Sequence, residues 1–276
     1  MESISGKTKI CIIIGDPIEA SLSPLIHNAG YQACDIGEEF VFVAARVESS
    51  AIGQAVAGLK VLGVRGITCT MPHKTTVMQY LDEIDPIAAK IGAVNTVVRN
   101  GSSLKGYNTD WIGVVEPLQD MVKLQGVSVA LLGAGGAARA ACYGLSAAGA
   151  EVTVYNRSID RASQLASDFG CSSAPVELFS KDHRIVVNAT SVGMAPGIDE
   201  SPLPPSVLHR EQIVFDMVYH PLETRLIRDA RKAGAHAIYG TEMLLHQAGA
   251  QFKLYTGRAA PLDSMRQALA PKVKIK

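Results

Sequence analysis

The chain has 276 residues, enough for two domains, and its 26 basic and 26 acidic side chains balance, which gives no support for a nucleic acid or an anionic membrane as partner. The 5 cysteines are scattered without a Cys-x-x-Cys pair, and the 7 histidines form no His-Glu-x-x-His motif, so no metal site is predicted. No apolar run is long enough to span a membrane, so we expect a cytoplasmic protein with free thiols that binds a small molecule.

Apolar runs typical of strands alternate with helical patterns from the start of the chain. Strand-like runs occupy 9–15, 40–46 and 66–70, and helical patterns fall at 24–34, 51–63 and 74–84. This alternation predicts a parallel sheet built from βαβ units. A hairpin is predicted around Asn100-Gly101, because this pair suits a tight turn between two β-rich segments. The alternation then restarts, so a second domain is expected from about residue 111.

The second domain begins with an apolar strand that leads directly into "GAGGAA", residues 133–138. Gly133 permits a tight turn, Gly135 lets the backbone approach a pyrophosphate, and Ala138 takes the place of a third glycine where helix and strand meet. Phosphates would bind the unpaired N–H groups at the helix N-terminus. Glycine also serves ordinary βα turns, but the strand before this turn and the helix after it favour a Rossmann-type dinucleotide site.

The next strand, at 151–155, ends at Asn156-Arg157, where an NAD enzyme usually carries an acid that binds the ribose 2′-hydroxyl. Arg157, with Arg161 one turn further on, can instead bind a 2′-phosphate through charge-assisted hydrogen bonds, which predicts NADP as the cofactor. The alternative is a solvated helix start that Ser158 or Asp160 caps, and this alternative needs no cofactor.

The rest of the chain continues the alternation. Strands are predicted at 184–191 and 212–219, followed by a helix with Pro221 near its first turn and a stop at Gly234. A last strand is predicted at 235–240, and a helix over 242–257 is expected to end at Gly257.

Lys74 follows Pro72 at the end of the strand at 66–70, and ligands bind at the carboxyl edge of open α/β sheets. A lysine gains nothing from the dipole of a helix N-terminus, which favours negative charge. Spacing alone leaves open whether Lys74 is a solvated surface charge or a catalytic group.

Several short motifs in a fixed order make nearly the whole chain resemble the shikimate dehydrogenase family. They are "SLSPLIHN", "TMPHK", "GAVNT", "GYNTD", "GAGGAARA", "NRS", "NATSVGM", "DMVY" and "GTEMLLHQ". The resemblance implies reversible reduction of 3-dehydroshikimate to shikimate by NADPH, with Lys74 and Asp110 as the catalytic pair. The "CT-PHK" and "EM" variants resemble the dehydrogenase half of the plant bifunctional dehydroquinate dehydratase/shikimate dehydrogenase.

The resemblance also implies a two-domain α/β fold. An α/β substrate domain at 1–110 would be completed by C-terminal helices at 241–276, because Gln247 must reach the cleft that Lys74 lines. A doubly wound Rossmann domain at 111–240 would bind NADP.

Individual residues receive roles from the same resemblance. Ser21 and Ser23 would hold the carboxylate of the substrate. The residues that would reach the ring hydroxyls and Lys74 are Thr70, Asn95, Asp110, Tyr219 and Gln247. The cofactor residues, with 188–191 lining the cleft, would be Gly133, Ala134, Gly135, Gly136, Ala137, Asn156, Arg157, Ser158, Arg161, Thr190, Met217 and Gly240.

Each of these positions also has a purely structural alternative. Ser23 could cap a helix, Asn95 could stabilise a turn, and Gln247 could be a solvated helix residue. Met217 and Met243 could simply pack in the core.

Three functions therefore follow from the sequence. The first is an NADP-dependent shikimate dehydrogenase of aromatic amino-acid biosynthesis, acting as a monomer or homodimer. The second is a quinate/shikimate dehydrogenase, because small changes around the substrate ring could admit an extra hydroxyl. The third is a non-catalytic NADP-binding regulator, which the presence of both Lys74 and Asp110 disfavours. The sequence assigns this pair and leaves open which residue holds the proton at each step.

Overall fold

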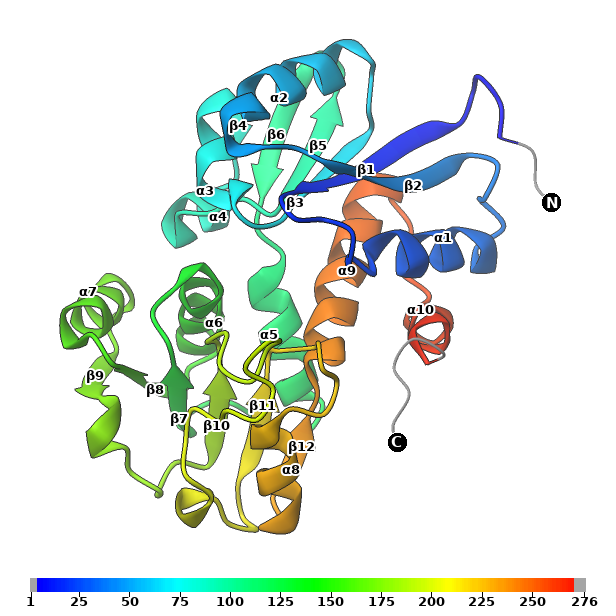
Figure 1. Ribbon diagram of the computed structural model, residues 1–276. Coiled ribbons are helices and arrows are strands. Elements are labelled where there is room, and N and C mark those ends of the chain that lie inside the picture. The colour runs from blue at the N-terminus through cyan, green and yellow to red at the C-terminus, as the bar shows by residue number, and fades with distance from the viewer. Residues whose placement is uncertain (1–3, 271–276) are drawn as a thin grey trace. The chain divides into compact units, whose positions relative to one another are not determined.

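The structure, a computed structural model, describes residues 4–270 and divides into two compact units (Figure 1). Unit 1 holds residues 4–109 and 247–270, and unit 2 holds residues 110–246. The sequence prediction puts the divisions after residues 110 and 240, so unit 2 extends further into the C-terminal part of the chain than expected. The predicted domain ends at 1–3 and 271–276 lie outside the described residues.

Unit 1 contains six strands and five helical segments of the α type. The strands are β1 (Lys9–Gly15), β2 (Phe40–Arg46), β3 (Gly66–Cys69), β4 (Glu83–Ile84), β5 (Thr96–Asn100) and β6 (Ser103–Tyr107). The helices that lie wholly in this unit are α1 (Ser23–Ala33), α2 (Ile52–Val61), α3 (His73–Thr76), α4 (Pro86–Ile91) and α10 (Leu262–Leu269). The long helix α9 (Gly240–Thr256) starts in unit 2 and enters unit 1 at Gln247.

The sheet of unit 1 has the strand order β2-β1-β3-β5-β6-β4. β1 pairs in parallel with β2 and β3, which confirms the predicted βαβ arrangement. β5 pairs antiparallel with both β3 and β6, and β5 and β6 form the predicted hairpin. Gly101 turns this hairpin with a φ of 61°, a left-handed conformation that glycine adopts without strain. The sheet is therefore mixed.

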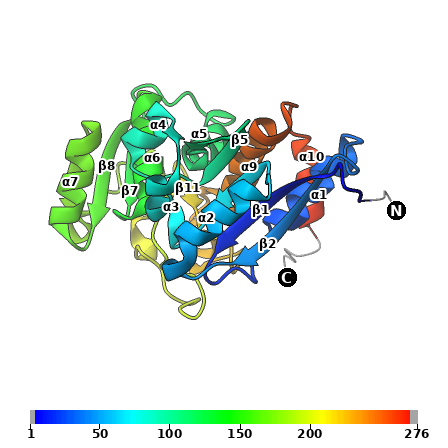
Figure 2. The same ribbon diagram turned by 90° about the horizontal axis from the view of Figure 1, so that it is seen from above.

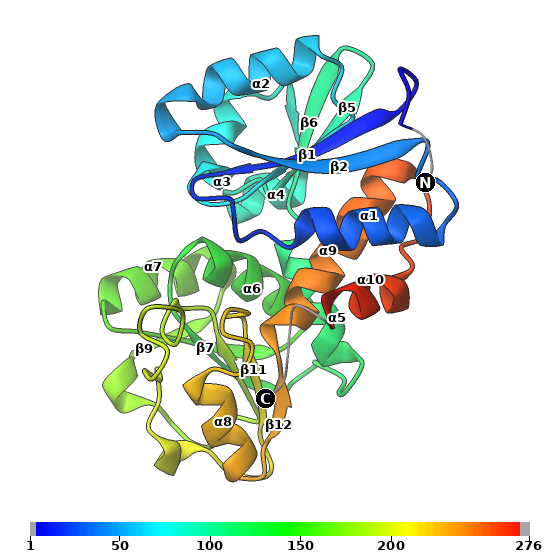
Figure 3. The same cartoon turned by 45° about the vertical axis from the view of Figure 1, so that its right-hand side comes forward.

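Two apolar layers cover the faces of this sheet, because successive strand residues point to opposite sides. Ile12 and Ile14 of β1 pack in one layer with Ile52 and Val56 of α2. Figure 2 shows the ribbon of α2 beside β1. Cys11 and Ile13 of the same strand pack in the other layer, with side chains from α1 and from the C-terminal part of α9. α10 lies beside α1 (Figure 3).

Unit 2 is a parallel six-stranded sheet with helices on both faces. Its strands are β7 (Ser128–Leu132), β8 (Glu151–Asn156), β9 (Ser172–Pro175), β10 (Ile185–Asn188), β11 (Ile213–Asp216) and β12 (His236–Ile238). Its helices, besides the start of α9, are α5 (Asp110–Gln119), α6 (Gly136–Ala147), α7 (Ile159–Phe169) and α8 (Arg225–Lys232).

The strand order β12-β11-β10-β7-β8-β9 is that of a doubly wound dinucleotide-binding sheet (Figure 1). The chain runs outward from β7 in one direction and from β10 in the other, so the order reverses between these two strands. Ligands of such sheets bind in the crevice outside the carboxyl ends of the strands at this reversal. The predicted Rossmann domain is confirmed.

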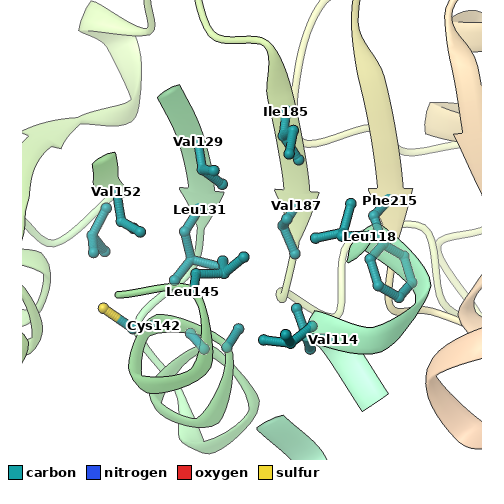
Figure 4. Close-up of a cluster of buried hydrophobic side chains, with 14 of the residues drawn as sticks. Val114, Leu118, Val129, Leu131, Cys142, Leu145, Val152, Ile185, Val187 and Phe215 are labelled. Atoms are coloured by element: carbon teal, nitrogen blue, oxygen red, sulfur yellow. The ribbon is translucent and has the colours of Figure 1, made fainter. Parts of the chain in front are cut away.

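The core of unit 2 also has two layers. Val129 and Leu131 of β7 point into the layer that contains α5, α6 and α7, where they pack with Leu145 (Figure 4). Ala130 and Leu132 point into the opposite layer, which contains α8.

Within the described residues, none of the helices combines the length and apolarity that crossing a membrane requires.

The predicted start of α8 is wrong. The sequence pattern predicts Pro221 near the first turn, but the helix begins at Arg225. Thr224 is its N-cap, and its hydroxyl accepts a hydrogen bond from the N–H of Ile227, so a side-chain cap starts this helix. The predicted stop at Gly234 is confirmed, because this residue has a φ of 77° directly after the helix.

Candidate functional site

The glycine turn of unit 2 starts at Gly133, which follows β7 and has a φ of 107°. A β-carbon at Gly133 would lie 3.0 Å from Cγ2 of Thr190 and 3.2 Å from the carbonyl oxygen of Ala189. Both the backbone conformation and the close approach of the chain after β10 therefore require glycine at this position.

Gly135 lacks a side chain for a different reason. It is the N-cap of α6 with an extended backbone, and a β-carbon built there would have no other atom within 4 Å. Folding therefore does not require glycine at this position. The missing side chain leaves an open cradle in front of the helix N-terminus, as close binding of a pyrophosphate needs. The turn thus fits a dinucleotide.

A cavity of about 610 Å³ opens beside this turn and lies within unit 2. It has the size of a small-molecule site. Its walls come from the ends of three neighbouring strands, β8, β7 and β10, and from two further segments. The lining residues are Leu132, Gly133, Ala134, Gly135, Tyr155, Asn156, Arg157, Val176, Ala189, Thr190, Ser191, Val192, Glu200, Ser201 and Pro202. The cavity therefore lies where the strand order of the sheet reverses.

Arg157 lines this cavity at the end of β8, and Arg161 follows it in the first turn of α7. Both guanidinium groups are exposed, and no carboxylate of the described residues forms an ion pair with either. Ser158 occupies the N-cap position of α7, but its side chain makes no capping bond, so the alternative in which Ser158 caps the helix is wrong. Two cations beside a nucleotide cavity provide donors for a phosphate.

The cavity only partly matches the predicted set of cofactor residues. Those outside its lining are Gly136, Ala137, Ser158, Arg161, Met217 and Gly240. The sequence did not predict Leu132, Tyr155, Val176, Val192 or the segment from Glu200 to Pro202 as cavity residues. Val176 directly follows β9, a strand that the sequence patterns did not predict. No signal in the sequence marks Glu200, Ser201 and Pro202, because the folded path of an irregular segment brings them to the cavity.

A buried hydrogen-bond network fixes the loops after β10 and β11. Oδ1 of Asp216 accepts bonds from Nδ2 of Asn188 at 2.9 Å and from the N–H of Val218 at 3.0 Å. Its Oδ2 accepts the hydroxyl proton of Thr224 at 2.5 Å. Asn188 in turn accepts bonds from the N–H and hydroxyl of Thr190. Burial raises the pKa of Asp216 to about 6, although all three donors act in the opposite direction.

The segment after β11 also packs tightly against the start of α9. A β-carbon at Gly240 would lie 2.5 Å from the carbonyl oxygen of Val218 and 2.8 Å from that of Met217, so only glycine allows this approach. Met217 is 8% exposed and belongs to the apolar layer of α6, and Met243 packs against the same layer. Core packing therefore describes both methionines in unit 2.

Lys74 lies in unit 1 on α3, a single helical turn that follows β3. His73 is buried beside it, and its Nε2 lies 2.7 Å from the carbonyl oxygen of Val47, which anchors the turn. The N–H of Val94 donates to the carbonyl of Lys74 at 2.8 Å. The Lys74 side chain is half-buried, and its charge partly offsets the burial that raises the pKa of the Cys69 thiol to about 12. Lys74 is therefore held firmly and is not a fully solvated surface charge.

Asn95 and Thr109 form a second anchored point in unit 1. Nδ2 of Asn95 donates to Oγ1 of Thr109 at 2.9 Å, and Oδ1 accepts the N–H of Thr109 at 2.8 Å. The hydroxyl of Thr96 donates to the same Oδ1 at 2.7 Å. These bonds support the turn-stabilising alternative for Asn95. They also fix the residue that precedes Asp110, the buried first residue of α5.

The remaining predicted substrate residues differ in exposure. Ser23 is buried and begins α1 without capping it, so the capping alternative is wrong, and its N–H donates to Oγ of Ser21 at 3.3 Å. Gln247 is 7% exposed, so it is not a solvated helix residue. Thr70 is half-buried, and Tyr219 is 37% exposed.

Within residues 4–270, no three His, Cys, Asp or Glu side chains gather as a metal site would require.

Three family models match the chain in sequence. The substrate binding domain of shikimate dehydrogenase matches residues 13–97. A model described as shikimate / quinate 5-dehydrogenase matches 116–195, and the C-terminal domain of shikimate 5′-dehydrogenase matches 240–270.

Relatives match the chain over nearly its full length. The NADP⁺-dependent shikimate dehydrogenase of Moorella thermoacetica is 40% identical, over 98% of this chain and 95% of that protein. A crystal structure of a shikimate dehydrogenase in complex with NADP⁺ has a TM-score of 0.94 at 35% identity and covers 99% of both chains. The Thermus thermophilus enzyme in complex with NADP(H) and shikimate has a TM-score of 0.89 at 35% identity, covering 95% of this chain and 98% of that one. The chain belongs to the shikimate dehydrogenase family.

Proposed function

We propose that this protein is an NADP-dependent shikimate dehydrogenase, which reversibly reduces 3-dehydroshikimate to shikimate in aromatic amino-acid biosynthesis. The observation that carries this function is the cavity of unit 2, which joins the open cradle at Gly135 to the unpaired guanidinium of Arg157. Membership of the family adds the substrate.

The cofactor supplies the hydride chemistry, and the chain supplies its binding and the proton. Gly133–Gly135 and the N-terminus of α6 would hold the pyrophosphate, and Arg157 and Arg161 would hold the 2′-phosphate. Asn156 and Arg157 stand at the end of β8, where an NAD enzyme usually carries an acid that binds the ribose 2′-hydroxyl. The same cavity therefore selects NADP over NAD.

Proton transfer is assigned to Lys74 and Asp110. Oxidation of a secondary alcohol removes the hydroxyl proton as a hydride leaves the carbon, and reduction returns that proton. The rigid turn that carries Lys74 supports this role, because a positioned group loses less entropy in the transition state than a mobile one. Asn95 helps to position Asp110, because its bonds to Thr109 hold the chain at the start of α5.

Substrate recognition is assigned to small polar groups. Ser21 and Ser23 bind the carboxylate, and the hydroxyls of the ring are bound by Thr70, Asn95, Tyr219 and Gln247. Burial of Ser23 and Gln247 supports this assignment, because a buried polar group that bonds a ligand discriminates strongly against analogues that lack the partner. Five free thiols support a reducing, cytoplasmic location. The protein acts there as a monomer or homodimer.

The second candidate is a quinate/shikimate dehydrogenase, which the description of the matched family model favours. Steady-state rates with shikimate and quinate, each with NADP and NAD, separate the two. We expect the highest kcat/KM for shikimate with NADP. A comparable or higher value for quinate with NAD would favour the second candidate, and cofactor binding without any turnover would favour a non-catalytic regulator.

A further inference from the structure

Two cysteines of unit 2 lie side by side, away from the cofactor cavity. Cys142 lies on α6, and Cys171 follows Gly170, the residue that ends α7. Their Sγ atoms are 3.6 Å apart. The two sulfurs are already in van der Waals contact, and a disulfide requires them to approach to about 2.05 Å.

The two thiols differ in their access to solvent. Cys142 is completely buried in the apolar layer between the sheet and α6 (Figure 4). Cys171 is half-buried and lines a second cavity of about 490 Å³. Polar side chains form much of the wall of this cavity: Ser128, Ser146, Glu151, Thr153 and Ser172. A small polar reagent can therefore reach Cys171 directly, whereas Cys142 is reached only through Cys171.

Hydrogen bonds around Cys171 favour its thiolate. Oγ of Ser146 lies 2.9 Å from its Sγ, one helical turn beyond Cys142 on α6. The Cys142 thiol and the Ser146 hydroxyl together lower the pKa of Cys171 to about 6, and the same thiol contact, followed by burial, raises the pKa of Cys142. The neutral Cys171 thiol can instead donate to the carbonyl of Phe169, but that contact is longer, at 3.7 Å.

Further contacts between α6 and the end of α7 hold the two thiols close together. Arg139, one turn before Cys142 on α6, pairs with Asp168 at 2.6 Å, and its guanidinium lies 5.3 Å from the ring centroid of Phe169. Three side chains on one side of α6, Arg139, Cys142 and Ser146, thus contact the last turn of α7 and the chain that follows it. This face of α6 keeps the sulfurs together in the folded state.

We propose that Cys171 is a thiol-modification site that reacts with small disulfides, and that Cys142 resolves the adduct. The Cys171 thiolate attacks one sulfur of the small disulfide, forms a mixed disulfide and releases one small thiol. Cys142 then attacks Sγ of Cys171, and its proton passes to the second small thiolate as that group leaves as a thiol. The two protein thiols are oxidised to one disulfide, and the small disulfide is reduced to two thiols. The proposal does not rest on the proposed function.

Cys34 provides a matched control, because it is also half-buried but lies in unit 1 without a neighbouring thiol. Native wild-type protein and the variants Cys142→Ser, Cys171→Ser and Cys34→Ser would be incubated at neutral pH with oxidised glutathione. The remaining thiols would then be alkylated and the digested peptides identified by mass spectrometry.

We expect a Cys142–Cys171 cross-link in the wild type and in Cys34→Ser. We expect a lasting glutathione adduct on Cys171 in Cys142→Ser, and an unmodified Cys142 in Cys171→Ser. An unreacted Cys171 in native wild-type protein, or an adduct on it that persists there without a cross-link, would overturn the proposal. The wild-type measurement decides the matter even if Cys142→Ser does not fold.

Discussion

The two units differ in how far general chemistry explains their roles. In unit 2 two features of the cavity follow from a residue type at a given place: Gly135 leaves open space at the start of α6, and Arg157 offers an unpaired cation. In unit 1, Lys74 is a half-buried lysine on a single helical turn, and the role proposed for it rests on the resemblance of its motif to the family. A site for a common cofactor reuses general rules, whereas a substrate site depends on one particular arrangement of side chains.

The largest expected effect tests the unit whose role is less evident. Lys74→Ala should leave NADP binding intact and lower kcat by roughly 10²–10⁴-fold, the usual loss for a positioned acid or base. Steady-state rates with shikimate and NADP measure this. Thr75→Ala, an exposed change on the same turn, is the control and should retain the wild-type kcat. A raised KM with an unchanged kcat in Lys74→Ala would mean that the lysine only anchors the substrate.

A smaller effect tests cofactor choice in unit 2. Arg157→Ala should weaken NADP far more than NAD, because only NADP offers a 2′-phosphate to the guanidinium. The expected loss is about 1.5–3 kcal/mol, the range for a charge-assisted hydrogen bond. Dissociation constants from fluorescence titration with both reduced cofactors measure it. Equal losses for the two cofactors would remove Arg157 from this role.

The two glycines of the turn separate folding from binding. Gly135→Ala should change the free energy of unfolding by less than about 0.5 kcal/mol, because the added methyl meets open space. It should weaken NADP binding by about 1 kcal/mol or more, because the methyl occupies room that the phosphate needs. Gly133→Ala should instead destabilise the protein itself, since its φ is 107° and Thr190 lies against it. Urea unfolding and NADPH titration of both variants test this contrast, and a stability loss in Gly135→Ala would contradict it.

Buried titratable groups distinguish the units through opposite pH effects. In unit 2 the pKa of Asp216 rises from 3.8 to about 6, so the folded state binds the proton more tightly and this group stabilises the fold increasingly as pH falls from about 6 to 4. In unit 1 His27 stacks on Phe42, and burial lowers its pKa from 6.5 to about 4. The unfolded state therefore binds the proton of His27 more tightly than the folded state does. The free energy of unfolding decreases for this reason as pH falls from 6.5 towards 4.

Each effect is at most about 1.4 kcal/mol per pH unit. We compare the free energy of unfolding of each variant with that of the wild type at pH 7 and at pH 5. From pH 7 to pH 5, this difference should become less favourable to Asp216→Asn and more favourable to His27→Gln. Urea unfolding at the two pH values measures both differences. Shifts of the same sign in the two variants would show that one of the two pKa directions is wrong.

Local patterns in the sequence were enough for much of the fold. The Asn100-Gly101 turn, the glycine turn before α6 and the stop at Gly234 each depend on backbone conformations that few residues adopt, so short segments reveal them. The predicted start of α8 is wrong because Pro221 also suits a first turn, whereas the cap that starts this helix is Thr224.

Parts of the site depend on contacts between distant segments, and these could not be predicted. The partners of Asp216 lie 28 residues before it and 8 residues after it, and no periodicity relates such positions. Glu200 reaches the cofactor cavity from an irregular segment for the same reason. Even Lys74 was ambiguous, because the bonds that fix its turn come from Val47 and Val94.

The central claim is that Lys74 of unit 1 and Asp110 of unit 2 act in one proton transfer. The most direct test is kcat for shikimate oxidation with NADP in the wild type, Lys74→Ala, Asp110→Asn and the double variant. We predict that each single change lowers kcat. The double variant should lose less than the sum of the two free-energy penalties, because the two residues would serve the same proton transfer. Fully additive penalties, or a wild-type protein that does not turn over shikimate, would contradict the account.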